Sequence, residues 1–240
     1  MPIRQNKNSH LILIGAPYAW GEIPGVMVFG YDPQRKVERW GFVPADTGPV
    51  LVNSSYEGVT GSFGVEGSDG EKAVLAYAAR QSISSFVSYC SSVNLPIYLV
   101  AKTFDDDGVT PIGCDFIDTA KLGGMKRGVN SDVVSFPFEA KDYVEVFGKE
   151  IVVKEFPGSA TLVTSLPFTT TAQALTDKNG SAYYALSVLR QTSGSTLVTR
   201  LRKAAAAAAG YYSETSSGIT LAAAAGLAVA DKALAIYVKA

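Results

Sequence analysis

Side chains that commonly perform catalysis or bind metals are scarce in this chain. Its 240 residues include one histidine, His10, and two cysteines, Cys90 and Cys114. A structural zinc site needs four nitrogen or sulfur ligands, so it would require all three side chains and a carboxylate. A Ser-His-Asp or Cys-His site would have to use His10, and nothing near it in the sequence supplies a nucleophile or an orienting acid. We therefore predict no catalytic residue, no metal and no cofactor.

The two cysteines do not form a C-x-x-C motif. A disulfide between Cys90 and Cys114 would require their Cβ atoms to meet, which a sequence cannot show. We favour two reduced thiols, each buried among apolar neighbours.

Three segments resemble ligand-binding loops. Segment 105–108, DDDG, has consecutive acids, whereas an EF-hand loop alternates them and ends on a Glu, where this chain has Phe116. The glycines at 61, 64 and 67 lack the G-x-G-x-x-G spacing of a phosphate-binding loop. The basic, glycine-rich segment 121–128 could contact nucleic acid or an acidic neighbour. We expect a hairpin turn, a flexible hairpin and a solvated loop at these three places.

The composition argues against two broad classes of protein. Apolar residues make up 47% of the chain, charged residues 18%, and the formal net charge is −1. Disordered chains combine low hydrophobicity with high net charge, and nucleic-acid binders are usually basic, so both classes are disfavoured. A weakly charged chain with 23 glycines suits a β-rich protein that hides much of its surface in an assembly.

The N-terminal apolar run does not have the form of a secretion signal. Segment 11–16 is short, and Pro17 and Trp20 stand where a small-residue cleavage site would be. No segment reaches the about 18 uninterrupted apolar residues of a membrane span. We expect a soluble protein that is made inside the cell and does not contact a membrane.

Charge divides the chain into two parts. Residues 1–177 carry 14 Lys and Arg against 20 Asp and Glu, a balance of −6, whereas residues 178–240 carry 7 against 2, a balance of +5. A candidate linker rich in Pro, Gly, Ser and Thr begins near residue 157. We predict a β domain at 1–160 and an accessory β domain at 161–240.

The hydrophobic pattern predicts strands in both parts and one helix. Segment 68–78 has acidic residues at its start and apolar residues at helical spacing, which predicts the helix. Segment 82–92 could extend this helix or form a strand. The predicted strands of the first part are 26–31 (ended by Asp32-Pro33), 50–66, 97–104, 109–117, 133–140, 143–147 (after a turn at Lys141-Asp142) and 151–156. Those of the second part are 183–189, 196–201, 219–221 and 234–238.

Two long segments resemble the tail tube proteins (major tail proteins) of tailed bacteriophages. One is VLVNSSYEGVTGSFGVE at 50–66 with the helix after it. The other runs from 95 to 151 and contains LPIYLVAKTFDDDGVTPIGCDFIDTAKLGG, followed by SDVVSFPFEAKDY. The C-terminal pattern, with GYY at 210–212 and GITL at 218–221, resembles small β-modules of phage virion proteins.

This resemblance implies a structural protein and not an enzyme. The first domain would be a β-sandwich or barrel flanked by one helix. Six copies would close a ring through a shared inner barrel, and rings would stack into a tube through which DNA passes with transient, non-specific contact. The other partners would be the tail terminator, the baseplate, the tape measure protein and, in some tails, a sheath. The protein would be made in the bacterial host cytoplasm and end in the virion tail.

We expect the assembly contacts in the hairpin 53–66 and the loop 118–130. The residues proposed for this interface are Asn53, Tyr56, Phe63, Met125 and Arg127. Two alternatives remain. One is another virion component, namely a capsid decoration, tail terminator or baseplate protein, and the other is a small-molecule enzyme or binding module. The sequence supplies no constellation of site residues for the latter.

Overall fold

Antiparallel β-strands make up most of this protein. In the computed structural model, the described residues are 9–15, 19–39, 51–77, 97–127, 132–177, 180–193, 198–206 and 210–240. One short α-helix, α1 (Gly67–Tyr77), accompanies several β-sheets, which confirms the prediction of a mainly β fold. None of the described helices is long and apolar enough to cross a membrane.

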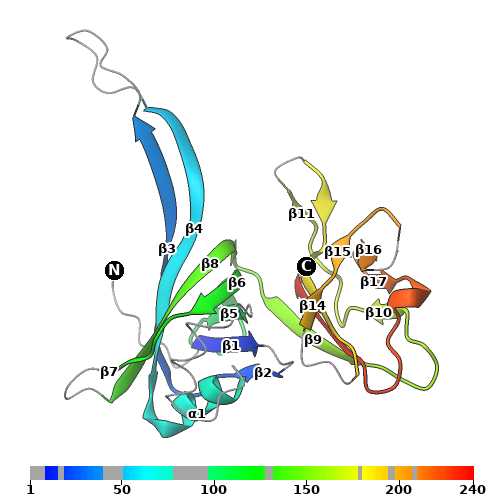
Figure 1. Cartoon of the computed structure of the whole chain (residues 1–240), viewed down its shortest axis with the longest axis horizontal. Helices are drawn as coiled ribbons and strands as arrows, with labels where there is room; N and C mark the ends of the chain where they lie inside the picture. Colours follow the sequence, from blue (N-terminus) through cyan, green and yellow to red (C-terminus); the bar gives the residue numbers. More distant parts are fainter. Residues whose placement is uncertain are drawn as a thin grey trace.

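Eight strands of the N-terminal part form one sheet (Figure 1). They are β1 (Ser9–Gly15), β2 (Ala19–Glu22), β3 (Val26–Arg39), β4 (Leu51–Glu66), β5 (Ile97–Phe104), β6 (Pro111–Leu122), β7 (Lys126–Arg127) and β8 (Val133–Phe147). Their order across the sheet is β2-β1-β5-β6-β8-β4-β3, and β7 also pairs with β8.

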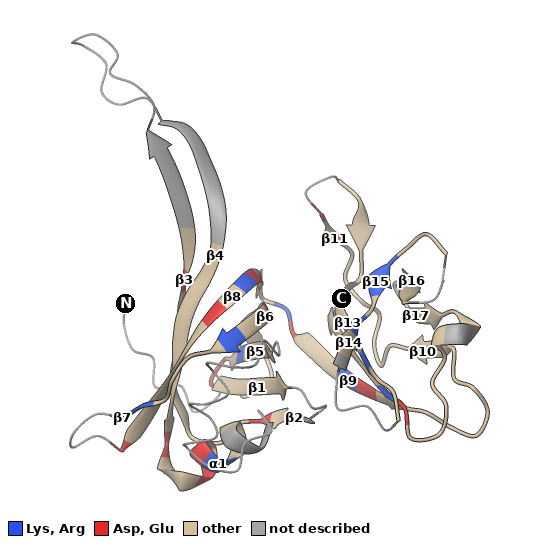
Figure 2. Cartoon of the chain, in the orientation of Figure 1, with Lys and Arg blue, Asp and Glu red and all other residues tan. Residues whose placement is uncertain are grey.

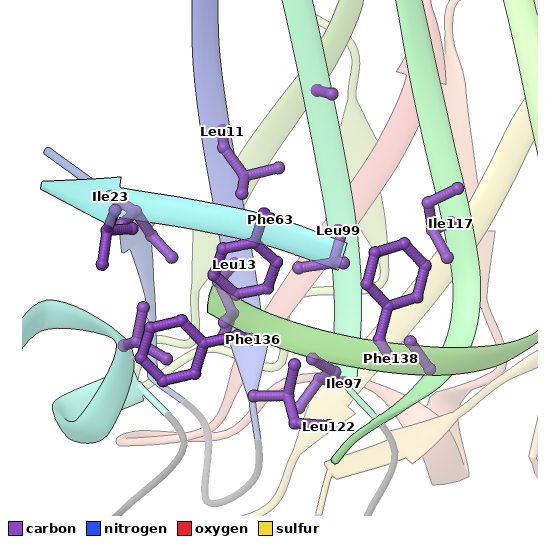
Figure 3. Close-up of a cluster of buried hydrophobic side chains, with 14 of the residues drawn as sticks. Leu11, Leu13, Ile23, Phe63, Ile97, Leu99, Ile117, Leu122, Phe136 and Phe138 are labelled. Carbon is purple, nitrogen blue, oxygen red and sulfur yellow. The ribbon is translucent and has the colours of Figure 1, made fainter. Parts of the chain in front are cut away.

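This sheet folds over itself, because β8 changes partner along its length. Its first half pairs with β4, from Val133 to Ala140, and its second half pairs with β6, up to Phe147. Strands β4 and β8 therefore cross in front of β1, β5 and β6, and Figure 3 shows Phe63, Phe136 and Phe138 in one cluster with Leu11, Leu13 and Leu99 of those strands. The side chains between the two layers form the first core, which consists mainly of Leu11, Leu13, Phe63, Ile97, Leu99, Ile117, Val134, Phe136 and Phe138.

The sequence of β8 explains which of its faces joins this core. Val134, Phe136 and Phe138 alternate with polar or less buried residues, so one face of the strand is apolar. Phe136 stacks on Phe63 with 5.3 Å between ring centroids, and Phe138 stacks on Phe29 of β3 at 6.2 Å. Packing of aromatic rings across neighbouring strands stabilises the pairing of β8, β4 and β3.

Two predicted strand ends are wrong. Strand β3 does not stop at Asp32-Pro33 but continues to Arg39, and Pro33 is tolerated because β3 lies at the edge of the sheet. The predicted turn at Lys141-Asp142 is absent, because β8 runs through both residues while it passes from β4 to β6. The strands predicted at 97–104 and 151–156, and the turn at 105–108, are confirmed.

The remaining strands form three smaller sheets. One four-stranded sheet has the order β14-β13-β18-β9, a second has the order β10-β17-β16-β15, and β11 pairs with β12. The bounds are β9 (Ile151–Pro157), β10 (Ser165–Pro167), β11 (Leu175–Thr176), β12 (Ala182–Tyr183), β13 (Ala185–Gln191), β14 (Val198–Arg200), β15 (Arg202–Lys203), β16 (Tyr211–Thr215), β17 (Gly218–Leu221) and β18 (Lys232–Val238), with a 3₁₀ turn, η1 (Ala223–Ala225). Among the described strands, every pair is antiparallel except β15–β16.

The chain leaves the first sheet between residues 147 and 151. Strand β9 pairs with β18 over its whole length, although β9 lies before the predicted boundary at residue 160. The division into two domains stays a prediction. A second apolar cluster, the junction core, contains residues from both sides of this point: Ile14, Tyr98, Val100, Cys114, Phe116, Val146, Ile151, Leu186, Leu189, Leu234, Ile236 and Val238.

Strand β5 lies between these two cores. Ile97, Leu99 and Ala101 face the first core, whereas Tyr98 and Val100 face the junction core. All five are buried. This double burial explains why the segment is an uninterrupted apolar run, and not an alternating one.

The helix prediction is confirmed over Gly67–Tyr77. Asp69 lies in its first turn, where the helix dipole favours a carboxylate. Val74 is fully buried in the first core, which fixes the helix against the sheet. Segment 82–92 and Cys90 lie outside the described residues.

Candidate assembly interface

Four strands, β7, β8, β4 and β3, form a layer whose second face points away from the first core. On this face, Glu139 of β8 lies beside Thr60 of β4, which lies beside Asp32 of β3. The next two rows are Pro137, Ser62 and Gly30, and then Ser135, Gly64 and Val28. We call these nine residues the polar face; eight of them are polar, small or charged, or are proline.

Hydrogen bonds order one end of the polar face. The Gln34 amide nitrogen donates to Thr60 Oγ1 at 3.1 Å and to Asp32 Oδ2 at 3.2 Å. A shallow hollow of about 350 Å³ lies beside Gln34 and Thr60, and Lys121, Glu139 and Lys141 complete its charged wall. Acidic and basic residues alternate along β8 near this hollow (Figure 2). The face therefore presents small polar groups and charges of both signs.

Both outer strands of the layer have a free backbone edge within the described part of the chain. Strand β3 pairs there with β4 alone, and β7 pairs with β8 alone. An unpaired strand edge exposes a row of N–H and C=O groups that can pair with another chain. These edges could not be identified from the sequence, because edge position depends on the order of strands in the sheet.

The β3–β4 hairpin extends well beyond the rest of the sheet (Figure 1). Strand β4 pairs with β8 only between Val59 and Glu66, whereas it pairs with β3 as far as Leu51. The outer half of the hairpin is thus a ribbon of two strands. A two-stranded ribbon is marginally stable in water without a third strand or a packing partner.

The five residues predicted to form the interface differ in burial and in how much of them is described. Phe63 is fully buried in the first core, so its side chain supports the layer from inside. Met125 is half-buried and packs against the same core. Asn53 pairs through its backbone with Glu38, Tyr56 with Arg35, and Arg127 with Val134, and their side chains lie outside what is described. The role of the five residues in assembly stays a prediction.

A pair of exposed apolar residues was missed by the sequence reasoning. Val109 and Phe147 are 76% and 75% exposed. Both lie near the start of β6, because Gly113 of β6 pairs with Phe147 and Val109 belongs to the turn before β6. Apolar residues exposed one by one are ordinary on a protein surface, so these two do not by themselves mark an interface. The alternating pattern of β8 does not reveal that Phe147 is exposed. Its exposure follows from the position of this end of β8 in the sheet, which the pattern does not give.

The DDDG turn is stabilised internally. The Asp107 carboxylate accepts hydrogen bonds from the backbone N–H groups of Val109 at 2.9 Å and Thr110 at 2.8 Å, and from the Thr110 hydroxyl. These bonds, the hydroxyl first, lower the pKa of Asp107. Among the described residues, no group of three or more His, Cys, Asp or Glu side chains is arranged to hold a metal ion.

The structure places a carboxylate beside His10, where the sequence showed none. The imidazole Nδ1 contacts the Glu22 carboxylate, because the β1–β2 pairing places Glu22 next to Ile12. The histidine ring also packs edge-on against Phe104 at 5.8 Å. The acid was not evident from the sequence because it is contributed by the neighbouring strand. Cys114 is buried and unpaired, as expected, and burial raises the pKa of its thiol.

Polar contacts join the two parts of the chain around the junction core. Trp20 Nε1 donates to Glu155 Oε2 at 2.8 Å, and Lys102 pairs with Glu150 at 2.8 Å. The Arg200 guanidinium lies 2.6 Å from Asp118 Oδ2. A groove of about 800 Å³ runs beside this pair, lined by Tyr98, Tyr143, Tyr183, Tyr212 and neighbouring charged residues.

Comparison with known proteins gives structural neighbours but no family. Neither a scan against protein-family models nor a search of curated proteins found a match. A chain of the PVC sheath–tube complex, from an extracellular contractile injection system in its extended state, has 10% identity and a TM-score of 0.38, with 61% of this chain and 92% of that chain covered. A chain of the anti-feeding prophage baseplate has 9% identity and a TM-score of 0.37, with coverage of 62% and 99%.

The third neighbour is the SPP1 Dit protein, described as part of the hub adsorption apparatus of phages that infect Gram-positive bacteria. It has 11% identity and a TM-score of 0.32, and covers 95% of this chain and 98% of that one. The three neighbours come from a contractile sheath–tube complex, a prophage baseplate and a phage hub adsorption apparatus. Similarity at this level does not identify a family or carry a function.

Proposed function

We propose that this chain is a structural subunit of a phage-like tail, and that its copies join into six-membered rings that stack to form the tail tube. The observation that carries the proposal is the β7–β8–β4–β3 layer, which is apolar on its inner face, polar on the other and open at both edges. The number six follows from the family resemblance, whereas the mode of contact follows from the sheet.

Ring closure would pair the free edge of β3 in one copy with the β7 side of the layer in the next. This contact joins two different surfaces, so repeated copies generate a ring if the rotation closes. Each copy would add its layer to a continuous barrel. A closed barrel has no free edge, which removes the aggregation hazard of β3 and β7.

The polar face would then line the lumen. Its serine, threonine and glycine residues offer no aromatic ring on which a base could stack. Asp32 and Glu139 repel phosphate, and Lys121 and Lys126 lie on neighbouring strands as local counter-charges. Such a lining would let DNA pass with transient, non-specific contact.

The projecting β3–β4 ribbon would reach the next ring in the stack. A ribbon of two strands gains stability when another surface covers it. Contact with the neighbouring ring would supply this surface. The remaining partners proposed for the chain are the terminator, the baseplate, the tape measure protein and a sheath, in the virion tail.

An edge-blocking substitution tests this proposal. Val28 is 45% exposed on β3, and Lys at an edge strand opposes pairing with another strand. We expect Val28→Lys to remain folded but to sediment as a monomer at concentrations where the unchanged protein forms rings. Val229→Lys is the matched control, since Val229 is 63% exposed and lies outside the layer.

The proposal fails if Val28→Lys assembles like the unchanged protein. Trimers would favour a capsid decoration protein. Single rings that never stack would favour a terminator or baseplate protein.

A further inference from the structure

A polar contact crosses from the edge strand β3 to β6, which lies in the opposite layer of the folded sheet. The hydroxyl of Tyr31 donates a hydrogen bond to Asp115 Oδ1 of β6 at 3.2 Å. The Tyr31 ring also packs against Tyr143 of β8, with 5.2 Å between ring centroids. Tyr31 thus ties the outer edge strand β3 to the paired strands β6 and β8.

Asp115 stands directly opposite a second carboxylate. In the β6–β8 ladder its cross-strand partner is Glu145. Like charges at directly opposed positions on neighbouring strands are destabilising. Asp115 is also half-buried, whereas Glu145 is exposed, so Asp115 bears most of the cost of losing water.

The groups around Asp115 do not neutralise its charge. On the β5 side its partner is Ala101, and the next residue, Lys102, pairs instead with Glu150. On the β4 side, the residue beside Tyr31 is Gly61. In the described part of the chain, the titratable groups of this cluster besides Asp115 are therefore Tyr31, Glu145 and Tyr143.

The pKa values of Asp115 and Tyr31 are shifted in the direction that this geometry predicts. Burial raises the pKa of Asp115 to about 6, the hydrogen bond from Tyr31 opposes the rise, and the charge of Glu145 adds to it. Burial and then the charge of Asp115 raise the pKa of Tyr31 far above its ordinary value, so the hydroxyl keeps its proton.

We infer that Tyr31, Asp115 and Glu145 form a proton-dependent latch that holds the edge strand β3 to the paired strands β6 and β8. Opening of the latch exposes Asp115 to water and returns its pKa toward about 3.9. The closed state therefore binds a proton more tightly than the open state. By linkage, the latch strengthens as the pH falls through about 6 and weakens as the pH rises.

Hydrogen exchange of the full-length monomer, corrected for intrinsic rates at each pH, measures latch opening directly. For a pKa that changes from about 6 to about 3.9, we expect the β3 amides that bond to β4 to be about tenfold more protected at pH 5 than at pH 7.5. Asp115→Asn should remove this difference. Glu139→Gln, which removes an exposed carboxylate of the polar face, should retain it.

Two further variants should shift the midpoint of the pH dependence in opposite directions. This test holds even if Asp115→Asn does not fold. Tyr31→Phe removes the hydrogen bond that lowers the pKa of Asp115, so the midpoint of the pH dependence should move up. Glu145→Gln removes the like charge, so the midpoint should move down. Equal protection at pH 5 and pH 7.5, an unchanged pH dependence in Asp115→Asn, or shifts in the same direction in these two variants would overturn the inference.

Discussion

Gly61 lies where three strands leave no room for a side chain. A Cβ atom at this position would lie 2.6 Å from the Gly30 carbonyl oxygen and 2.9 Å from Cε1 of Phe138. Both distances are shorter than real contacts of a Cβ atom. The glycine is therefore required by the packing of β3, β4 and β8, and not by phosphate binding.

Replacement of this glycine should lower stability. We expect Gly61→Ala to reduce the free energy of unfolding by about 1–3 kcal/mol, because the Phe138 ring and the β3 backbone must move apart. Gly124→Ala is the control, since a Cβ atom there would meet nothing within 4 Å. Urea unfolding of both variants provides the measurement, and equal stabilities would contradict the packing described at Gly61.

Strand β8 connects the two layers of the first sheet. Phe136, near its start, is fully buried between the layers, whereas Phe147, at its end, is largely exposed. The same residue type on one strand thus occupies a core and a surface. This contrast offers a direct test of the layer arrangement.

Truncation of the two rings should have unequal effects. Phe136→Ala should destabilise the protein by about 3–5 kcal/mol, because it leaves a cavity against Phe63. Phe147→Ala should change stability by no more than about 0.5 kcal/mol. Chemical denaturation of both variants checks this, and a large loss in Phe147→Ala would mean that the end of β8 is covered.

The strands could be predicted where the signal is local. Segment 97–104, followed by DDDG, gave a hairpin because Asp and Gly favour turns and the flanking runs are apolar. The break at Asp32-Pro33 and the turn at Lys141-Asp142 were wrong because tertiary context overrides local breakers. An edge position accommodates Pro33, and a change of partner strand carries β8 through residues 141 and 142.

The candidate interface was less predictable than the strands. Phe63 has the residue type of an interface anchor, but only the register of β4 with β8 shows that it faces the first core. The free edge of β3 and the Tyr31–Asp115 contact depend on residues distant in sequence. Such pairings follow from the order of strands, which a hydrophobic pattern does not specify.

The junction core links the first sheet to the β14-β13-β18-β9 sheet. Phe116 is buried there and lies parallel to Tyr98, with 6.3 Å between ring centroids. Residues of β13 and β18 complete the cluster. Shared burial of this kind predicts that the two parts unfold together.

A variant in the junction core tests this cooperativity. We expect Phe116→Ala to lower the free energy of unfolding by about 3–5 kcal/mol and to reduce the amide protection of β18 as well as that of β6. Hydrogen exchange resolved by element makes the comparison. If the β18 amides kept their full protection, the two parts would be independent domains.

The most direct test of the proposed function is negative-stain electron microscopy of the purified chain over a series of concentrations. The β7–β8–β4–β3 layer, with its two free edges, predicts rings with a central hole that stack into tubes as concentration rises. A protein that stays monomeric, or that forms only closed particles without a hole, at every concentration would contradict it.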